Sequence, residues 1–378
     1  MMFYYTVFVI LFCLSLYEIF FKVNKRIKNA AELLVLTLLI LISSVRGDGI
    51  GDYNNYKMLF ESTNTDVNVI TSILQPNMRL SEPLYSILNY TIKYFGGSFQ
   101  TLVFMEALFV NTVMYIICKK IMRSVQENAA GKDYTLTVFF IMWCLGLYNV
   151  IIIRQTLAVS VCWFSIKYIR KRNLKGFLIC WLAAVCLHQS EILWLPSYWI
   201  YHFNVRKPVI RYQFMLALLC AGAAGAVFVK PLAPYIPGVA GEKVRMYFSM
   251  GLDSFGLDYS VAFIFLKTFM NIGVILAMLV FLFRSLKDEK LFCGLYNLYL
   301  TGAALVLATS FVSNQLSRVA QAYTMISIFL FPYLFRLKSG RNSKMVLFMM
   351  FSFYMGIRLY INIHGSTVLM QGYPVWRS

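Results

Sequence analysis

The chain has 378 residues, of which 60% are hydrophobic and only 13% are charged. Soluble domains carry about 25% charged residues, so this composition excludes an ordinary soluble protein. Long apolar runs predict an all-α, multi-pass integral membrane protein, because the strands of a β-barrel would alternate apolar and polar residues. The lipid bilayer is therefore the first expected partner.

The net charge of +19 would suit nucleic-acid binding, but its distribution indicates another role. Of the 35 lysines and arginines, 23 fall in or beside six short loops between apolar segments. Short basic loops stay in the cytoplasm and orient the spans, so no nucleic-acid partner is expected. These loops cover residues 22–30, 119–134, 167–176, 202–211, 284–290 and 336–344.

In chain order, the apolar segments predict about 10–12 transmembrane helices in a single transmembrane domain, residues 1–378. The segment 177–201 has a basic loop at each end, so it should be a hairpin or a broken helix with its tip at His188 and Gln189. The other expected spans are 3–21, 31–45, 101–118, 134–152, 155–169, 212–229, 259–283, 291–309, 319–335 and 345–361.

Two longer segments are expected outside the cytoplasm, at 46–100 and 230–258. The first contains a short apolar helix, 84–95, which is too short to cross a core about 30 Å thick and should lie in the interface. The eight cysteines form no CxxC pair and the three histidines are far apart. Neither pattern predicts a metal site or a cofactor.

Several arginines map to the outer ends of spans, where the orientation rule disfavours positive charge. Arg46, Arg154 and Arg318 each lie within a polar cluster, which fits snorkelling to lipid phosphates poorly. A guanidinium presents a planar fork of donors to phosphate oxygens and stays charged. These arginines predict a membrane cavity for an anionic, lipid-borne ligand.

The stretch "RGDGIGDYNNY", residues 46–56, is the first polar cluster. Its glycines and Arg46 could bind an anion, whereas Asp48 and Asp52 favour sugar hydroxyls or acid/base chemistry. The alternative interpretation is a flexible polar turn. Tyr53 and Tyr56 are candidates for stacking on sugar rings.

Four later stretches also carry candidate residues, each with a plainer alternative. The acid in "RLSEP" suits a helix start, and a lone histidine in "LHQSEILWLP" is often a core residue. An ionisable residue between two spans, as in "NVIIIRQTLAVS", is a site hypothesis by default. With "SNQLSRVAQAY", these stretches supply Glu82, Arg154, Gln155, His188, Arg318 and Tyr323.

The order of these motifs resembles the EpsG-type family of bacterial exopolysaccharide and O-antigen polymerases, which are Wzy-like proteins. The resemblance extends from about Arg46 to Pro332. Within the first motif, the spacing between glycine and the Asp52-Tyr53 step departs from the family pattern by one residue. The matching residues are Arg46 to Tyr53 with Tyr56, Glu82-Pro83, Arg154-Gln155 with Ala158, His188 with Ser190, and Arg318.

The resemblance implies a metal-independent glycosyltransferase with a GT-C-like membrane fold. Such polymerases join oligosaccharide repeat units carried on undecaprenyl pyrophosphate, at the outer face of the bacterial inner membrane. The growing glycan leaves its carrier and moves to the free end of the next unit. A chain-length regulator protein is a further candidate partner.

The reaction needs fixed cations at the leaving diphosphate and a proton acceptor at the attacking hydroxyl. Arg154, Arg318 and Arg46 suit the first need. Asp52, Glu82 and His188 compete for the second, and we favour an outer-loop carboxylate, with His188 as a pyrophosphate or sugar contact.

The sequence is also compatible with two other classes of protein. A flippase for the same lipid-linked sugar would also place arginines in a cavity, but along a path open to both sides. A membrane acyltransferase using His188 would need a paired acid and an entry for its acyl donor. Crowding of the arginines on one face favours the enzyme that polymerises glycan.

Overall fold

The computed structural model describes most of the chain and shows only helices, turns and connecting segments in that part. It divides into two compact units, Met1–Ile192 with Pro332–Ser378 and Leu193–Phe331. The described residues are 2–21, 24–45, 53–74, 82–127, 133–145, 153–203, 268–309, 316–336 and 340–364, with 235, 242, 245 and 266. The predicted span 212–229 and nearly all of the loop 230–258 lie outside these ranges.

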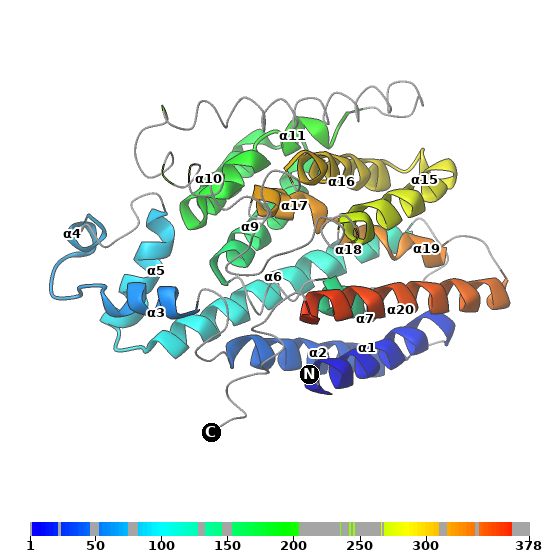
Figure 1. Cartoon of the computed structure of the whole chain (residues 1–378), viewed down its shortest axis with the longest axis horizontal. Coiled ribbons are helices and arrows are strands. Elements are labelled where there is room, and N and C mark those ends of the chain that lie inside the picture. The colour runs from blue at the N-terminus through cyan, green and yellow to red at the C-terminus, as the bar shows by residue number, and fades with distance from the viewer. Residues whose placement is uncertain are drawn as a thin grey trace. The chain divides into compact units, whose positions relative to one another are not determined.

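The first unit contains both ends of the described chain (Figure 1). Its helices are α1 (Met2–Phe20), α2 (Lys25–Ser44), α3 (Tyr53–Glu61), α4 (Val69–Ile73), α5 (Pro83–Tyr94), α6 (Phe99–Glu127), α7 (Thr135–Leu145), α9 (Ile153–Arg170), α10 (Leu174–Leu187), α19 (Tyr333–Arg336) and α20 (Arg341–His364). The 3-10 helix η1 (Gln189–Trp194) begins in this unit and ends in the second.

The second unit is smaller. It contains α11 (Ser197–Ile200), the π-helical turn η3 (Phe269–Gly273), α15 (Val274–Leu286), α16 (Lys290–Thr309), the 3-10 helix η4 (Leu316–Ala320), α17 (Gln321–Thr324) and α18 (Ser327–Leu330). The predicted span 319–335 is thus a series of short helical pieces with turns before Ser327 and Tyr333. Pro332, which cannot donate a backbone hydrogen bond, lies in the second turn.

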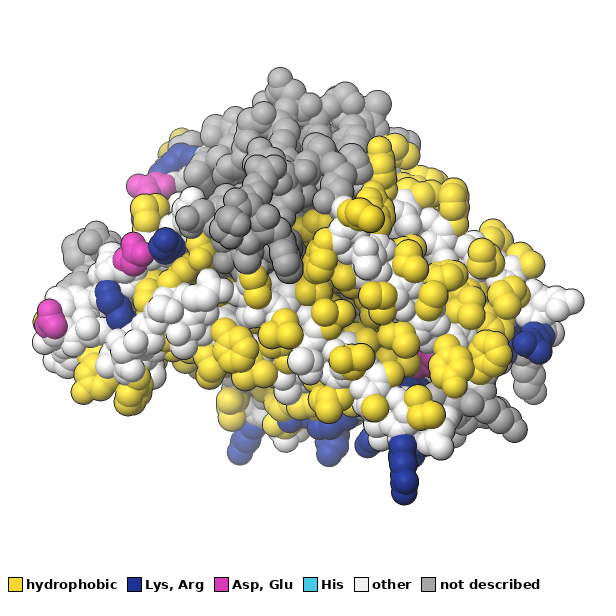
Figure 2. Space-filling view, turned by 90° about the horizontal axis from the view of Figure 1, so that it is seen from below, with side chains coloured by type: hydrophobic (Ala, Val, Ile, Leu, Met, Phe, Trp, Pro, Cys, Tyr) yellow, Lys and Arg dark blue, Asp and Glu magenta, His cyan; other side chains and the backbone are white. Residues whose placement is uncertain are grey.

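Within the described ranges, six helices are long and apolar enough to cross a membrane, which confirms the all-α, multi-pass prediction. They bear many exposed apolar side chains, such as Leu34 and Phe353, and hydrophobic side chains cover much of the face in Figure 2. Such a surface is stable in lipid and not in water. The six are α1, α2, α6, the segment Phe269–Leu286, α16 and α20, and α7 and α10 are shorter apolar helices.

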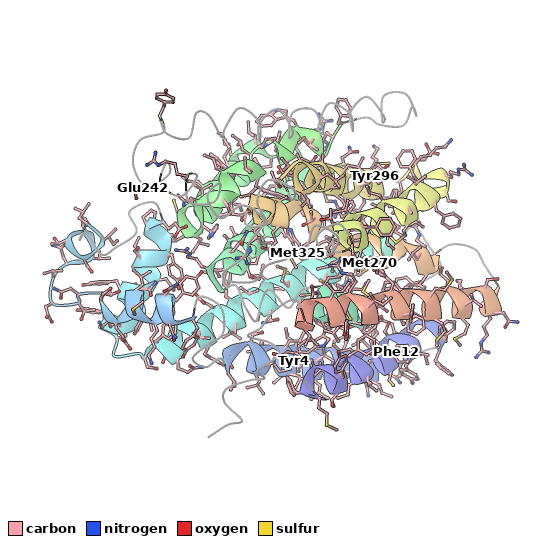
Figure 3. The ribbon with its side chains drawn as sticks, viewed as in Figure 1. Tyr4, Phe12, Glu242, Met270, Tyr296 and Met325 are labelled. Carbon is pink, nitrogen blue, oxygen red and sulfur yellow. The ribbon has the colours of Figure 1, made fainter. Side chains whose placement is uncertain are left out.

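Aromatic side chains join α1 to α7 and α20. Tyr4, labelled in Figure 3, is buried and its ring centroid lies 6.0 Å from that of Trp143. The Trp143 indole N–H donates to the carbonyl of Tyr4 at 3.2 Å. Phe12 stacks on Phe348 of α20 at 5.3 Å. These contacts add directional packing to the area that each ring buries.

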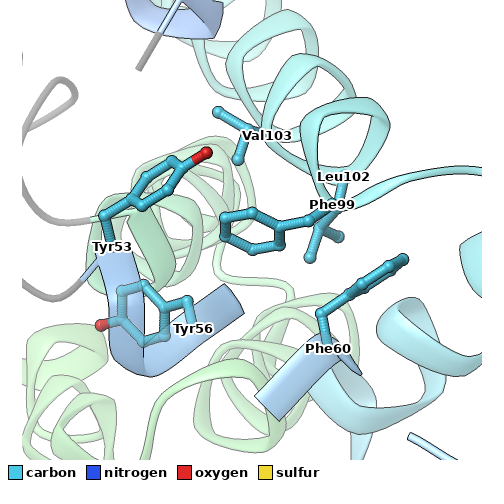
Figure 4. Close-up of a cluster of buried hydrophobic side chains, with 6 residues drawn as sticks. All are labelled: Tyr53, Tyr56, Phe60, Phe99, Leu102 and Val103. Carbon is cyan, nitrogen blue, oxygen red and sulfur yellow. The ribbon is translucent and has the colours of Figure 1, made fainter. Parts of the chain in front are cut away.

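The segment 46–100 contains more helix than the sequence predicted. The expected short helix 84–95 is present as α5, Pro83–Tyr94, with Pro83 in its first turn. Helices α3 and α4 precede it, and Asn68 caps α4 by accepting from the Thr71 backbone N–H. Tyr53, Tyr56 and Phe60 of α3 pack with the start of α6 in one cluster (Figure 4).

The segment 177–201 is a broken helix, as predicted. Helix α10 ends at Leu187, and the backbone of His188 is extended, with φ −152° and ψ 117°. The 3-10 helix η1 and then α11 follow. Because the α-helical hydrogen-bond ladder stops at this point, the next backbone N–H, that of Gln189, becomes available to a side chain from another helix.

Five charged residues meet where α1, α2, α6 and α7 converge. The carboxylates of Glu18, Glu32 and Asp133 lie within 4.8 Å of one another. Lys28 lies 2.7 Å from Glu18, and Lys119 lies 2.6 Å from Glu32 and 2.9 Å from Asp133. Two ammonium groups thus stand among three carboxylates, which makes this an ion-pair network. The sequence did not predict it.

Backbone groups complete this network at the start of α7. The N–H groups of Leu136 and Thr137 donate to Glu18 at 3.0 and 2.8 Å. Burial raises the pKa of Asp133, but Lys28 and the hydrogen bonds to that carboxylate more than offset it, so its pKa lies below the usual value. Asp133 is therefore held in its charged form, as charge pairing requires.

In the second unit, α16 packs closely on α17. A Cβ atom added to Gly302 would lie 2.6 Å from Cβ of Tyr323 and 2.7 Å from the backbone nitrogen of Thr324. By contrast, a Cβ on Gly356 of α20 would meet only Phe8, at 3.7 Å.

We therefore expect Gly302→Ala to separate α16 from α17 and lower the melting temperature in detergent, at a cost of about 1–3 kcal/mol typical of overpacking. The control Gly356→Ala should be neutral or stabilising by up to about 1 kcal/mol, because alanine favours helix. Equal melting temperatures for the two variants would contradict this packing.

Candidate functional site

An ion pair between Glu82 and Arg154 lies at the centre of the candidate site. Glu82 precedes α5, is fully buried, and accepts a hydrogen bond from the Arg154 guanidinium. Arg154 lies in the first turn of α9 and is 5% exposed. Both residues were predicted as site residues, and the structure joins them although 72 positions separate them.

Two tyrosine rings cover the guanidinium of Arg154. Its central carbon lies 5.2 Å from the ring centroid of Tyr56 and 5.5 Å from that of Tyr85. The two rings meet edge to face, with centroids 6.2 Å apart. Cation–π contacts of this kind strengthen when they are desolvated. Tyr56, predicted to stack on sugar, therefore contacts the arginine, and Tyr85 joins it from α5.

The break after α10 contacts the same ion pair. The backbone N–H of Gln189 donates to Oε1 of Glu82 at 3.3 Å, while Arg154 binds Oε2. Both oxygens of Glu82 therefore accept hydrogen bonds, which reduces its fitness as a proton acceptor. The contact also brings His188, one residue earlier, to the site. Predicted residues from α3, the N-cap of α5, the first turn of α9 and the α10–η1 break are thus assembled in one place.

His188 is linked to a buried acid through a serine. Its Nδ1 lies 2.6 Å from Oγ of Ser190, and that hydroxyl donates to Oε1 of Glu191 at 3.1 Å. The other Glu191 oxygen accepts from the Cys162 thiol of α9 at 3.4 Å. His188 and Ser190 are half-buried, whereas Glu191 is 2% exposed.

Two other predicted residues lie in the first unit with buried side chains. Tyr53 packs against Phe99, with ring centroids 5.0 Å apart, and its hydroxyl donates to Gln100 at 3.4 Å. Gln155, the neighbour of Arg154 in α9, is 4% exposed. Arg46, Asp48 and Asp52 lie outside the described residues.

The remaining two predicted residues belong to the second unit. Arg318 is a half-buried residue of η4. Tyr323 of α17 is fully buried, donates its hydroxyl to the carbonyl of Leu193 at 2.7 Å, and packs on Trp194 with ring centroids 4.7 Å apart. These contacts fix the end of η1 to α17 within that unit.

The two ends of α9 differ in charge environment. Arg154 lies in its first turn, whereas Lys167 and Arg170 lie in its last turn, next to a basic loop. An α-helix rises 1.5 Å per residue, so the 18 residues of α9 extend about 27 Å, close to the thickness of a hydrocarbon core. Arg154 is therefore separated from the basic loop by most of that thickness.

Fold and site together define a multi-pass helical membrane protein with a buried arginine–glutamate pair beside a broken helix. The chain belongs to the EpsG family, because the family model matches residues 30–374. This match confirms the resemblance inferred from the motifs. Membership indicates a membrane protein of polysaccharide polymerisation. Comparisons with curated proteins and with solved structures gave no match.

Proposed function

We propose that this chain joins oligosaccharide repeat units, carried on undecaprenyl pyrophosphate, into O-antigen, capsule or exopolysaccharide. The observation that carries the proposal is the family match over residues 30–374, and the Glu82–Arg154 site supports it. The proposal places the protein in the bacterial inner membrane, with a GT-C-like architecture and a chain-length regulator as a further partner.

The proposed site faces the periplasmic or extracellular side. Support comes from α9, where Arg154 and the basic residues of the last turn lie at opposite ends. If the basic end is cytoplasmic, Arg154 lies near the outer surface. A lipid-linked diphosphate in the outer leaflet would then have its charge at the depth of the guanidinium.

In the proposed reaction, an acceptor hydroxyl oxygen attacks the anomeric carbon while the bond to the diphosphate oxygen breaks. The leaving diphosphate takes the bonding electron pair and gains negative charge, which Arg154 stabilises with no metal ion required. Glu82 and the two tyrosine rings hold that guanidinium in position. Arg46 and Arg318 are proposed as further contacts to the diphosphate.

The acceptor hydroxyl must lose its proton. Of the two candidates within the described residues, Glu82 already accepts two hydrogen bonds. The half-buried imidazole of His188 is therefore the acceptor that we propose. This choice moves the role away from the outer-loop carboxylate favoured by the sequence.

One observation favours the acyltransferase alternative. That class needs an acid paired with His188, and Glu191 lies two hydrogen bonds away. The family assignment favours glycan transfer for the same residues.

Chain length in cells separates these classes. Deletion of the gene should leave acceptors that carry a single repeat unit, and the intact gene should restore the ladder of longer chains on a gel. Deletion of a flippase would remove the glycan altogether, and loss of an acyltransferase would leave chain length unchanged, so either result would overturn the proposal.

A further inference from the structure

A hydrogen-bonded relay starts at His188 and ends on a carboxylate that the proposed mechanism has not used. The relay runs from His188 Nδ1 to Ser190 Oγ over 2.6 Å, and from Ser190 Oγ to Glu191 Oε1 over 3.1 Å. All three residues lie at the break between α10 and η1. Glu191 is buried and the imidazole is half-buried, so the relay leads from the interior toward the surface.

The donors and acceptors of the relay determine the tautomer of His188. An ionised carboxylate only accepts, and a serine hydroxyl has a single hydrogen. With Glu191 ionised, that hydrogen is donated to Glu191, and the Ser190 oxygen then accepts from His188. The proton of a neutral imidazole is then on Nδ1, and Nε2 is the nitrogen that presents a lone pair.

We infer that Glu191, acting through Ser190, is a positioning residue that makes Nε2 of His188 the proton acceptor for the incoming hydroxyl. The inference rests on the proposed function. As the new C–O bond forms, the acceptor O–H bond breaks and its proton moves to Nε2. The imidazolium keeps its Nδ1–H on Ser190, and the negative charge of Glu191 stabilises it. The electron pair of the broken glycosyl bond leaves with the diphosphate.

Other titratable and charged groups face the relay from neighbouring elements. Cys162 of α9 contacts Glu191 Oε2 at 3.4 Å. Glu82 reaches the relay through the N–H of Gln189 and is paired with Arg154. Among these groups, Glu191 is therefore the one whose charge should control the protonation of His188.

The test is the pH dependence of polymerisation by purified protein in liposomes with a lipid-linked repeat unit. Glu191→Gln should lower the rate about 10²-fold, the lower end of the range for general base catalysis. It should also shift the acidic limb of the rate profile to lower pH, because loss of the anion destabilises the imidazolium. Ser190→Ala should lower the rate and shift the acidic limb in the same direction. Ser190→Thr, which keeps the hydroxyl, should have the wild-type rate and the wild-type position of the acidic limb.

The matched control is Cys162→Ala, which removes the other contact to Glu191 but leaves the relay intact, so its acidic limb should stay in place. If the acidic limb of the pH–rate profile stays at its wild-type pH in both Glu191→Gln and Ser190→Ala, the inference is wrong, although the polymerase assignment still stands. If Glu191→Gln does not fold, the Ser190→Ala and Ser190→Thr pair decides alone. A wild-type protein that forms no polymer would overturn the proposed function and, with it, this inference.

Discussion

The double variant Glu82→Gln, Arg154→Met should accumulate in the membrane close to the wild-type level and make no polymer. The two substitutions remove both charges of a buried pair together, so neither side chain is left as an uncompensated ion. Removing both charges together avoids the large cost of leaving one partner of a buried pair as an uncompensated charge. The guanidinium, however, is the group that we propose at the leaving diphosphate, and losing one such donor typically costs 10²–10³-fold in rate.

The single variants separate the structural role of the pair from the chemical one. Arg154→Met or Glu82→Gln alone breaks the pair, and removal of one partner of a buried pair typically costs about 3–5 kcal/mol when it strands the other charge. Arg154→Met, which strands Glu82, should therefore reduce the protein level more than the double variant does. Immunoblots of membranes and glycan gels measure level and product separately. A double variant that still made long chains would show that the pair only supports the fold.

Lys119→Met should destabilise the protein strongly. It leaves three carboxylates facing one ammonium group, and Glu32 is fully buried. Removal of one partner of a buried ion pair costs about 3–5 kcal/mol, which should lower the melting temperature of the protein in detergent by several degrees.

The neighbouring residue offers a matched control. Lys120 is exposed, so Lys120→Met should leave the melting temperature nearly unchanged. Adding Glu32→Gln to Lys119→Met restores the original excess of one negative charge and should recover much of the lost stability. If Lys119→Met melted like the wild type, the network would not hold α1, α2, α6 and α7 together.

Those parts of the fold that follow from hydrophobicity and charge could be predicted from the sequence. Apolar runs predicted α1, α2, α6 and α20, and the basic loops at both ends of 177–201 predicted the break at His188. Helices α3 and α4 were missed, because their stability comes from packing of Tyr53, Tyr56 and Phe60 on α6 and from the Asn68 cap. Such contacts are not visible in a local hydrophobic pattern.

The site was predictable as a set of residues but not as an arrangement. Glu82 and Arg154 stood out because charge near a membrane span is costly, yet nothing local shows that they pair. Tyr85 and Glu191 gave weaker signals, since a tyrosine in an apolar helix and an acid after a serine are common. Their roles depend on contacts with Arg154 and His188, which only the folded chain provides.

The most direct test of the central claim uses purified protein in liposomes with a lipid-linked repeat unit as its only substrate. The proposed polymerase should produce a ladder of longer glycans and release one undecaprenyl pyrophosphate for each link formed, without added metal ions. Movement of the lipid-linked unit across the bilayer with no new link and no released carrier would contradict the account.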